Sequence, residues 1–282
     1  MTSRIANSTV ERTAILQAAT ALHMVGAGSG SPARLIALLC DESLGADELA
    51  GKLEAHPVLA ARVLKVANSA YYGQSRRVGS VRQALLILGS NAVRGIAAAA
   101  CIDQVMPRRA ATLPDIVSLF RHSLATAIAC EMLATSTHPP LGADAFIAGL
   151  VHNLGVVIQA SVDPTGMGAM INARRTDPVM DIRALEAQHA QVRHEECAGV
   201  LFDAWQLPDA LIAAAVHHHW PEAAPEPHRT LVSLVSTAAT AALAGGFTYS
   251  LEPQAPALAG PEIQHIVSEL PGRVEQLSQA LR

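Results

Sequence analysis

The sequence has few aromatic and few charged residues for its length. Aromatic side chains make up 3% of the 282 residues and charged side chains 16%, and the formal net charge is -4. Nucleic-acid binding relies on clustered positive charge, and binding of single strands usually adds aromatic stacking. The arginine pairs at 76–77, 108–109 and 174–175 are isolated from one another. The composition therefore argues against a nucleic-acid partner.

Closely spaced cysteines are also absent. Cys40, Cys101, Cys130 and Cys197 form no Cys-x-x-Cys pair, which argues against a zinc ribbon and against a thioredoxin-like motif. Each lies in an apolar or helix-like stretch, where cysteine packs as a small hydrophobic residue. We expect all four to be buried free thiols.

No apolar run reaches the roughly 18 to 20 residues that a membrane-spanning helix needs. The nearest, Leu231 to Phe247, is interrupted by serines and threonines. The first ten residues are polar and lack the apolar core of a secretory signal. We therefore expect a cytoplasmic protein with no membrane partner.

Hydrophobic residues make up 50% of the sequence and recur at helical spacing, without runs of alternating β-branched residues. This pattern predicts an all-α fold of two helical subdomains. In the first half, helices are expected at Glu11 to Val25, Pro32 to Leu39, Ala46 to Glu54 and Pro57 to Asn68. Two more follow, one ending at Leu88 with Ser80 as its N-cap and one ending at Met106 with Asn91 as its N-cap. In the second half, helices are expected at Asp115 to Ala134, Ala143 to Val151, Leu154 to Val162, Pro178 to Gln188, His194 to Trp205, Pro208 to His217, Arg229 to Ala244, and from Glu262 to the end.

Composition also suggests boundaries along the chain. Residues 1–30 hold a helix and a glycine-rich loop, and residues 31–106 form the first helical subdomain. Residues 107–114, with two prolines and two arginines, are the expected linker to the second subdomain at 115–245. Residues 246–282 form a C-terminal helical extension.

In the helix expected at 57–68, Val58, Ala61 and Leu64 should share one face, with Leu64 in the core.

Twelve histidines is a high count, and several stand at the ends of expected helices. His122 lies on the helix after the linker, His152 ends an apolar helix, and His194 opens another. His217, His218 and His219 close a fourth. Facing helices in a bundle core commonly build metal sites, but spacing along the chain does not show whether these residues meet.

Several segments together carry a family resemblance. Residues 56–73 (HPVLAARVLKVANSAYYG) and 78–89 (VGSVRQALLILG) resemble the N-terminal signature of HDOD domains, the bacterial HD-related output domains. Residues 146–155 (FIAGLVHNLG) resemble the family's F-x-x-G-L-L-H-D-I-G motif. The stretch His194 to Pro208 and the sequence HHWP at 218–221 resemble later motifs. The resemblance covers roughly residues 30–245.

This resemblance implies an all-α fold related to the HD phosphohydrolases, with the C-terminal subdomain as an HD-like helical bundle. It also implies a signalling or regulatory role. HD enzymes hold one or two metals with histidines, a His-Asp doublet and a later aspartate, and the metals activate water. His122 and His152 match the first two histidine positions, and His194, His218 and His219 match later ones.

The sequence departs from that pattern at both acidic positions. The position of the aspartate in the His-Asp doublet is occupied by Asn153. The position of the later aspartate falls near Ala239, in an expected helix with no acidic residue. A carboxylate offsets the charge of a cation, whereas an amide offers only a dipole. We therefore expect a non-catalytic signalling protein without a cofactor.

Such a protein would act through a protein partner in trans, and self-association stays open. The alternative is a metal-dependent phosphohydrolase or cyclic-dinucleotide phosphodiesterase with a reduced ligand set. A single residual divalent metal would use His152, His194 and His218. Nucleotide binding without turnover is a third possibility.

Residues 68–73 form the family-signature loop and have two interpretations. In the first, Asn68 and Ser69 end the preceding helix, Gly73 adopts a positive φ, and Tyr71 and Tyr72 pack under the turn. In the second, the paired tyrosines anchor a partner protein.

Overall fold

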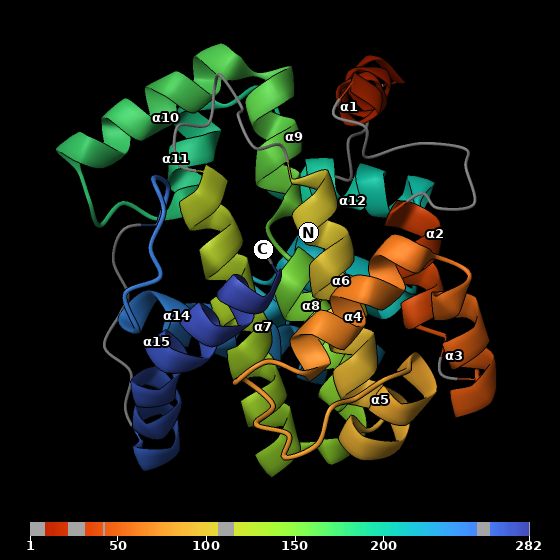
Figure 1. Ribbon diagram of the computed structural model, residues 1–282. Coiled ribbons are helices and arrows are strands. Elements are labelled where there is room, and N and C mark those ends of the chain that lie inside the picture. The colour runs from red at the N-terminus through yellow and green to blue at the C-terminus, as the bar shows by residue number, and fades with distance from the viewer. Residues whose placement is uncertain (1–8, 22–31, 42, 107–115, 253–259, 282) are drawn as a thin grey trace.

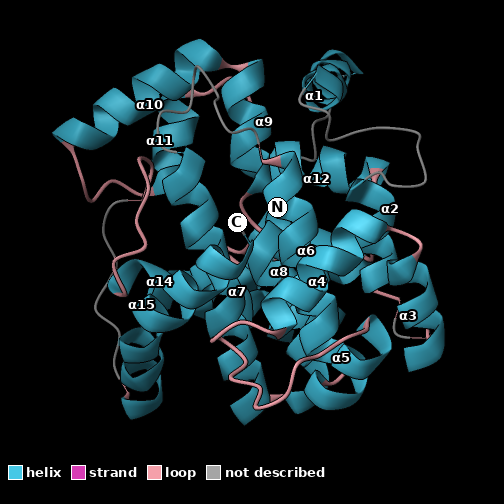
Figure 2. Cartoon of the chain, in the orientation of Figure 1, coloured by secondary structure: helices cyan, strands magenta, loops and turns pink. Residues whose placement is uncertain are grey.

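The computed structural model describes residues 9–21, 32–41, 43–106, 116–252 and 260–281 (Figure 1). Its regular structure is helical, and the described residues contain no β-strand, only an isolated bridge between Tyr249 and Glu252 (Figure 2). The predicted all-α class is therefore confirmed. The linker predicted at 107–114 lies outside the described residues.

The α-helices follow the predicted order closely. They are α1 (Thr9–Ala21), α2 (Pro32–Leu39), α3 (Ala46–Glu54), α4 (Pro57–Ala67), α5 (Val81–Leu88), α6 (Ser90–Val105), α7 (Ile116–Thr137), α8 (Gly142–Val151), α9 (Leu154–Val162), α10 (Pro164–Thr176), α11 (Ile182–His189), α12 (His194–Ala204), α13 (Asp209–His217), α14 (Arg229–Ala244) and α15 (Pro261–Leu281). Short 3-10 turns lie at Pro139–Leu141, Pro221–Ala223 and Glu226–His228.

Helices α6, α7 and α8 occupy the centre of the molecule (Figure 1). Helix α7 packs against α8, α14 and α15, and α8 packs against α6. One continuous hydrophobic cluster extends from Ile15 on α1 to Leu281 on α15. The two predicted subdomains therefore share a single core.

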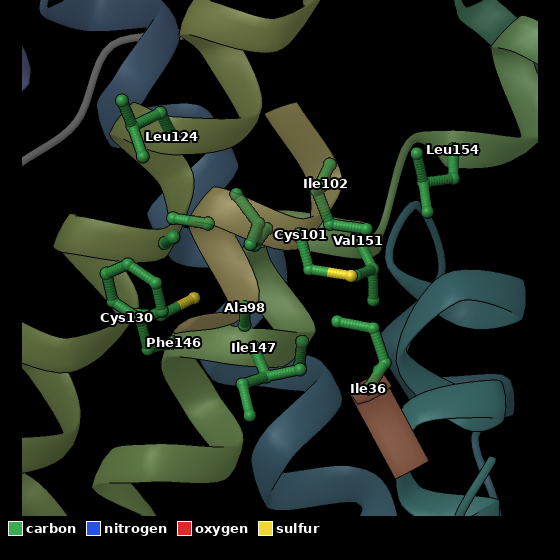
Figure 3. Close-up of a cluster of buried hydrophobic side chains, with 14 of the residues drawn as sticks. Ile36, Ala98, Cys101, Ile102, Leu124, Cys130, Phe146, Ile147, Val151 and Leu154 are labelled. Carbon is green, nitrogen blue, oxygen red and sulfur yellow. The ribbon is translucent and has the colours of Figure 1, made fainter. Parts of the chain in front are cut away.

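The centre of this core is packed with small and medium apolar side chains. Cys101 on α6 and Cys130 on α7 lie there among Phe146, Ile147 and other residues (Figure 3). Burial raises the pKa of the Cys101 thiol to about 12. Three of the four cysteines are buried free thiols as predicted, and Cys40 is half-buried.

Two segments, Ile116–Thr137 and Asp144–Val162, are long and apolar enough by composition to cross a bilayer. Most of each segment is buried inside this protein. Their position in the core accounts for their apolar character, since a helix surrounded by other helices needs no polar face.

The predicted face of α4 was wrong. Its buried residues include Leu59, Val63 and Val66, whereas Val58 is 66% exposed and Leu64 is only partly buried against the core. Because apolar residues stand at most positions of this helix, several helical phases fit the sequence equally well. Packing against α6, α3 and α5 selects among them.

Helix α10 was not predicted. Asp163 caps its N-terminus by accepting hydrogen bonds from the backbone N–H of Gly166 at 2.8 Å and of Gln191 at 2.7 Å, and Pro164 opens the helix. Glycines and polar residues in its sequence hid the periodicity. In addition, α6 begins at Ser90, so Asn91 is not its cap.

The α4 assignment predicts a contrast between two leucines. Leu59→Ala should lower the free energy of unfolding by about 2 to 5 kcal/mol, because Leu59 is buried and truncation leaves a cavity. Leu86→Ala on α5 is the control, since Leu86 is 80% exposed, and it should change stability by less than about 0.5 kcal/mol. Urea unfolding of both variants measures this, and equal losses would contradict the assigned face.

Candidate functional site

Five histidines from four parts of the chain meet inside the protein. His122 lies on α7, His152 follows α8, His194 opens α12, and His218 and His219 follow α13. Ring centroids are 5.4 Å apart for His122 and His152, 4.9 Å for His152 and His218, 5.4 Å for His194 and His218, and 4.1 Å for His218 and His219. We call these five residues the histidine cluster.

A close approach of two helices brings His152 and His194 together. His152 and Asn153 form the tight turn between α8 and α9. Two residues later, a Cβ added at Gly155 would collide with the backbone oxygen of His194 and lie 2.9 Å from the backbone nitrogen of Ala198. Only glycine allows α9 to pack this tightly on α12.

Hydrogen bonds fix the ring orientation of three cluster members. The Nδ1 atom of His122 lies 2.9 Å from the Phe247 oxygen, that of His152 lies 2.7 Å from the Gly149 oxygen, and that of His218 lies 3.0 Å from the Ala215 oxygen. A carbonyl oxygen only accepts, so Nδ1 carries the proton in each ring. The Nε2 atom of the neutral ring is therefore left with a lone pair.

These Nε2 atoms have no partner. In all five members of the histidine cluster, Nε2 is buried without a hydrogen bond to any described residue. Burial lowers the pKa of His122 to about 4, and burial together with neighbouring histidines holds the pKa of His152, His218 and His219 well below its ordinary value. Four members of the cluster are thus held as neutral imidazoles, and in His122, His152 and His218 the lone pair lies on Nε2.

His194 has a different environment because a buried carboxylate contacts it. Glu186 on α11 accepts hydrogen bonds from His194 Nδ1 at 2.7 Å, from the His194 backbone at 2.9 Å and from Gln159 at 2.8 Å. Burial alone lowers the pKa of His194, but Glu186 outweighs it and raises that pKa to about 9. Burial raises the pKa of Glu186, but His194 reverses this and holds it below its ordinary value.

Residues 245–252, which follow α14, close over the cluster. The Phe247 oxygen accepts from His122, and the Tyr249 hydroxyl accepts from Asn153 Nδ2 at 3.2 Å. Glu252 Oε1 lies 3.3 Å from His219 Nε2, without the alignment of a hydrogen bond. Burial raises the pKa of Glu252 to about 7. The boundary predicted between the second subdomain (115–245) and the C-terminal extension (246–282) therefore separates residues that together surround the histidines.

The structure shows the surroundings of Asn153 and Ala239, which the resemblance matches to the family's two aspartates. Asn153 is buried beside His152, and its Oδ1 has no partner among the described residues. Ala239 lines a cavity of about 520 Å³ together with His218, His219 and Glu252. A second cavity, of about 840 Å³, extends from His219 past Glu186 to Trp220.

Two carboxylates were missed at the sequence level. Glu186 and Glu252 lie outside the motifs that carry the family resemblance, and they reach the cluster only through the packing of α11 and of residues 245–252. The sequence analysis considered only histidines beside the two lost acidic positions, and the structure adds these two carboxylates to the surroundings of the cluster. The donor group that the described residues bring together is His194, His218 and His219, not His152, His194 and His218.

The family-signature loop follows the first interpretation. Asn68 donates to the Leu64 and Val78 oxygens and accepts from the Val78 backbone at 2.8 Å, so it holds the loop closed. Ser69 bonds the Val66 oxygen, and Gly73 has φ 55°. Tyr71 and Tyr72 are half-buried, pack edge to face at 4.8 Å, and lie against the core.

Comparison with known proteins identifies the family. The pattern of the HDOD domain matches residues 30–221, about two thirds of the chain. The chain belongs to the HDOD family. The predicted resemblance is confirmed, and the histidine cluster of this HDOD protein lies mainly within the matched region, with residues 245–252 beyond it.

Individual relatives are distant. An uncharacterised protein from Treponema pallidum (strain Nichols) is 28% identical over 179 residues, which cover 62% of this chain and 34% of the relative. The chain therefore spans about a third of the length of that curated relative.

Solved structures share the fold. An HDOD domain protein of unknown function from Geobacter sulfurreducens has a TM-score of 0.71 at 20% identity, covering 96% of this chain and 97% of that one. A provisionally named signal transduction protein from Marinobacter aquaeolei VT8 has a TM-score of 0.75 at 21% identity, with coverage of 99% and 67%. A provisionally named phosphohydrolase from Shewanella amazonensis SB2B has a TM-score of 0.69 at 22% identity, with coverage of 95% and 98%.

The close approach of α9 to α12 predicts opposite effects for two glycine substitutions. Gly155→Ala should lower the free energy of unfolding by about 1 to 3 kcal/mol or more, because the new methyl group meets backbone rather than a movable side chain. At Gly168, an exposed position of α10, a new methyl group meets nothing within 4 Å, so Gly168→Ala should raise stability by about 0.5 to 1 kcal/mol. Denaturant unfolding compares the two, and a stabilising Gly155→Ala would contradict the described packing.

Proposed function

We propose that this HDOD protein is a cytoplasmic signalling module that does not hydrolyse phosphate esters and acts by contacting another protein. One observation carries the proposal. The resemblance matches the two acidic positions of HD enzymes to Asn153 and to a position near Ala239; Asn153 is buried beside His152, and Ala239 lines a cavity with His218 and His219. A signalling role also agrees with the name of the Marinobacter structure.

The chemistry at Asn153 opposes a two-metal mechanism. A pair of divalent ions needs negative ligands between or beside them to offset repulsion, and the water they activate becomes a hydroxide only when the ions are firmly held. The Asn153 amide is neutral, and its Nδ2 is already engaged by Tyr249. The side of the cluster formed by His122, His152 and Asn153 therefore lacks the charge that the reaction requires.

Contact with a protein partner draws support from the surface of α4 and α5, two helices that pack together. Val58 on α4 is 66% exposed, and Leu86 and Ile87 on α5 are 80% and 43% exposed. Large apolar side chains exposed on two neighbouring helices favour an interaction surface on this part of the molecule. Tyr71 and Tyr72 are less suited to this role because they are half-buried.

The second candidate function is a metal-dependent phosphohydrolase. The observation that favours it is the group of unpartnered Nε2 atoms, which have the character of metal ligands. The name of the Shewanella structure points in the same direction. Activity would then require a metal-bound hydroxide to be generated without the aspartate of the His-Asp doublet, whose position Asn153 occupies.

An assay of phosphate release separates the two functions. Wild-type protein supplied with Mn²⁺, Fe²⁺ or Zn²⁺ should hydrolyse p-nitrophenyl phosphate and cyclic di-GMP no faster than the His152→Ala variant, because the missing carboxylates prevent firm binding of two ions. Turnover that disappears in His152→Ala and on chelation would establish the phosphohydrolase instead. Circular dichroism of the variant confirms that it is folded.

The proposed partner surface predicts a second contrast. Leu86→Glu should weaken capture of a crosslinked partner from the native organism by at least about tenfold, as expected for an apolar residue at the centre of an interface. Val179→Glu is the matched control, because Val179 is 79% exposed elsewhere on the molecule. Quantitative mass spectrometry measures recovery, and equal capture by both variants would exclude α5 as the contact.

A further inference from the structure

Helix α15 is an amphipathic helix that covers the surfaces of α4, α7 and α14. It lies beyond residues 30–221, the part of the chain that matches the HDOD domain. The apolar residues that it buries recur at helical spacing, and they include Ile266, Leu270, Val274, Leu277 and Leu281. We call the surfaces of α4, α7 and α14 that these residues cover the α15-binding face.

Pro271 divides α15 into two parts. Proline has no backbone N–H, so the Val267 carbonyl lacks its usual partner four residues later. Pro271 and Gly272 are both exposed, and proline is a common cause of a bend in a helix. Figure 1 shows that α15 changes direction along its length. The second part, residues 272–281, therefore depends on its tertiary contacts more than on continuity with the first.

The polar contacts between α15 and α7 lie near solvent. The Ser136 hydroxyl donates to the Glu262 carboxylate, and both residues are exposed. Arg121 Nη1 lies 3.3 Å from Glu275 Oε2, and these side chains are 34% and 46% exposed. Exposed ion pairs contribute little to stability. The apolar residues of α15 therefore provide most of its attachment.

The second part of α15 also places a cation beside a carboxylate on α7. Burial raises the pKa of Glu131, and the neighbouring Arg273 guanidinium opposes that shift. Arg273 also contacts the Tyr71 hydroxyl of the family-signature loop. Removing the cation would leave a largely buried carboxylate without its opposite charge, which is unfavourable. The α15-binding face thus selects both an apolar pattern and one positive charge.

We propose that the α15-binding face is a helix-binding site for a partner protein, and that α15 occupies it in cis and thereby controls access to it. The partner segment is an amphipathic helix with apolar residues at the spacing of Ile266, Leu270, Val274 and Leu277 and with lysine or arginine at the position of Arg273. Recognition of a helix by its apolar face is a recurrent mode of protein association.

This site deepens the proposed function and rests on it in one respect, namely that the natural occupant is a protein. It names the kind of partner and the element that regulates binding. The α15-binding face is distinct from the exposed apolar residues Leu86 and Ile87 on α5. The two surfaces are therefore tested by different variants.

Competition in cis sets the size of the expected effect. The apparent affinity of a ligand falls in proportion to the fraction of protein that is competent to bind it. If α15 covers the face in about 99% of molecules, an added helix binds about 100-fold more weakly than it would bind the uncovered face. A substitution that loosens α15 restores that affinity.

A labelled synthetic peptide of residues 261–281, added to the full-length protein, tests the proposal by fluorescence anisotropy. Leu277 is 2% exposed, so Leu277→Glu in the protein should release α15 and tighten peptide binding by at least about tenfold over the wild type. Gln276→Glu is the matched control, because it adds the same charge at an exposed neighbouring position, and it should bind like the wild type. A peptide that itself carries Leu277→Glu should bind none of these proteins.

Hydrogen exchange of the wild-type protein supplies a measurement that needs no substitution. Amides of residues 273–281 should exchange through a local opening at least about tenfold faster than the buried amides of α7, because a regulatory element has to open without global unfolding. Equal protection of the two segments would overturn the proposal. Circular dichroism confirms that the Leu277→Glu protein is folded.

The peptide experiment has two further outcomes that would contradict the proposal. Equal affinity of the wild-type and Leu277→Glu proteins for the peptide would exclude competition by α15. A wild-type dimer that dissociates in Leu277→Glu would assign the face to α15 of a second copy instead of a partner protein. Phosphate release and the capture of a partner through Leu86 are measured separately, so failure of the proposed function is distinguished from failure of this site.

Discussion

Hydrogen bonds to the Nδ1 atoms of buried imidazoles organise the centre of this HDOD protein. In His122, His152 and His218 a backbone carbonyl holds Nδ1, and in His194 the Glu186 carboxylate does so. Each bond occupies the Nδ1 atom and leaves Nε2 directed away from the group that holds the ring. His152 and His218 bond carbonyls in the last turn of the helix that each follows, whereas His122 lies within α7 and bonds the Phe247 carbonyl after α14.

This arrangement is expensive for a purely structural core. A buried polar group without a partner costs about 1 to 3 kcal/mol, and an apolar replacement of the same shape is often neutral. The Nε2 atoms of the cluster are buried without a hydrogen bond to a described residue, so each bears such a cost unless water or another ligand reaches it.

The fold was largely predictable because helical periodicity, caps and breakers act locally. Ser80 caps α5 through the Gln83 backbone, and Gly89 ends it with φ 85°, both readable from the sequence. The buried face of α4 was not predictable from the sequence, because its apolar positions fit more than one helical phase. Helix α10 was missed because glycines and polar residues hide its periodicity, although Asp163 and Pro164 mark its start; the bond from Asp163 to the Gln191 backbone is supplied only by the tertiary fold.

The candidate site was predictable only for residues inside recognisable motifs. His122, His152, His194, His218 and His219 meet as the resemblance implied, and Asn153 and Ala239 mark the missing carboxylates. Glu186 and Glu252 could not be found in this way, because neither stands at a motif position and each reaches the cluster from a separate segment. Charge at a buried site is a property of everything packed around it, and it cannot be summed from the motif alone.

Residues 245–252 connect the cluster to the rest of the molecule. They contact His122, Asn153 and His219 through Phe247, Tyr249 and Glu252, and the next helix in the chain, α15, packs on α4 and α7. Helix α4 in turn packs on α5, which bears the exposed Leu86. The histidine cluster and the proposed partner surface are therefore connected through residues 245–252, α15, α4 and α5.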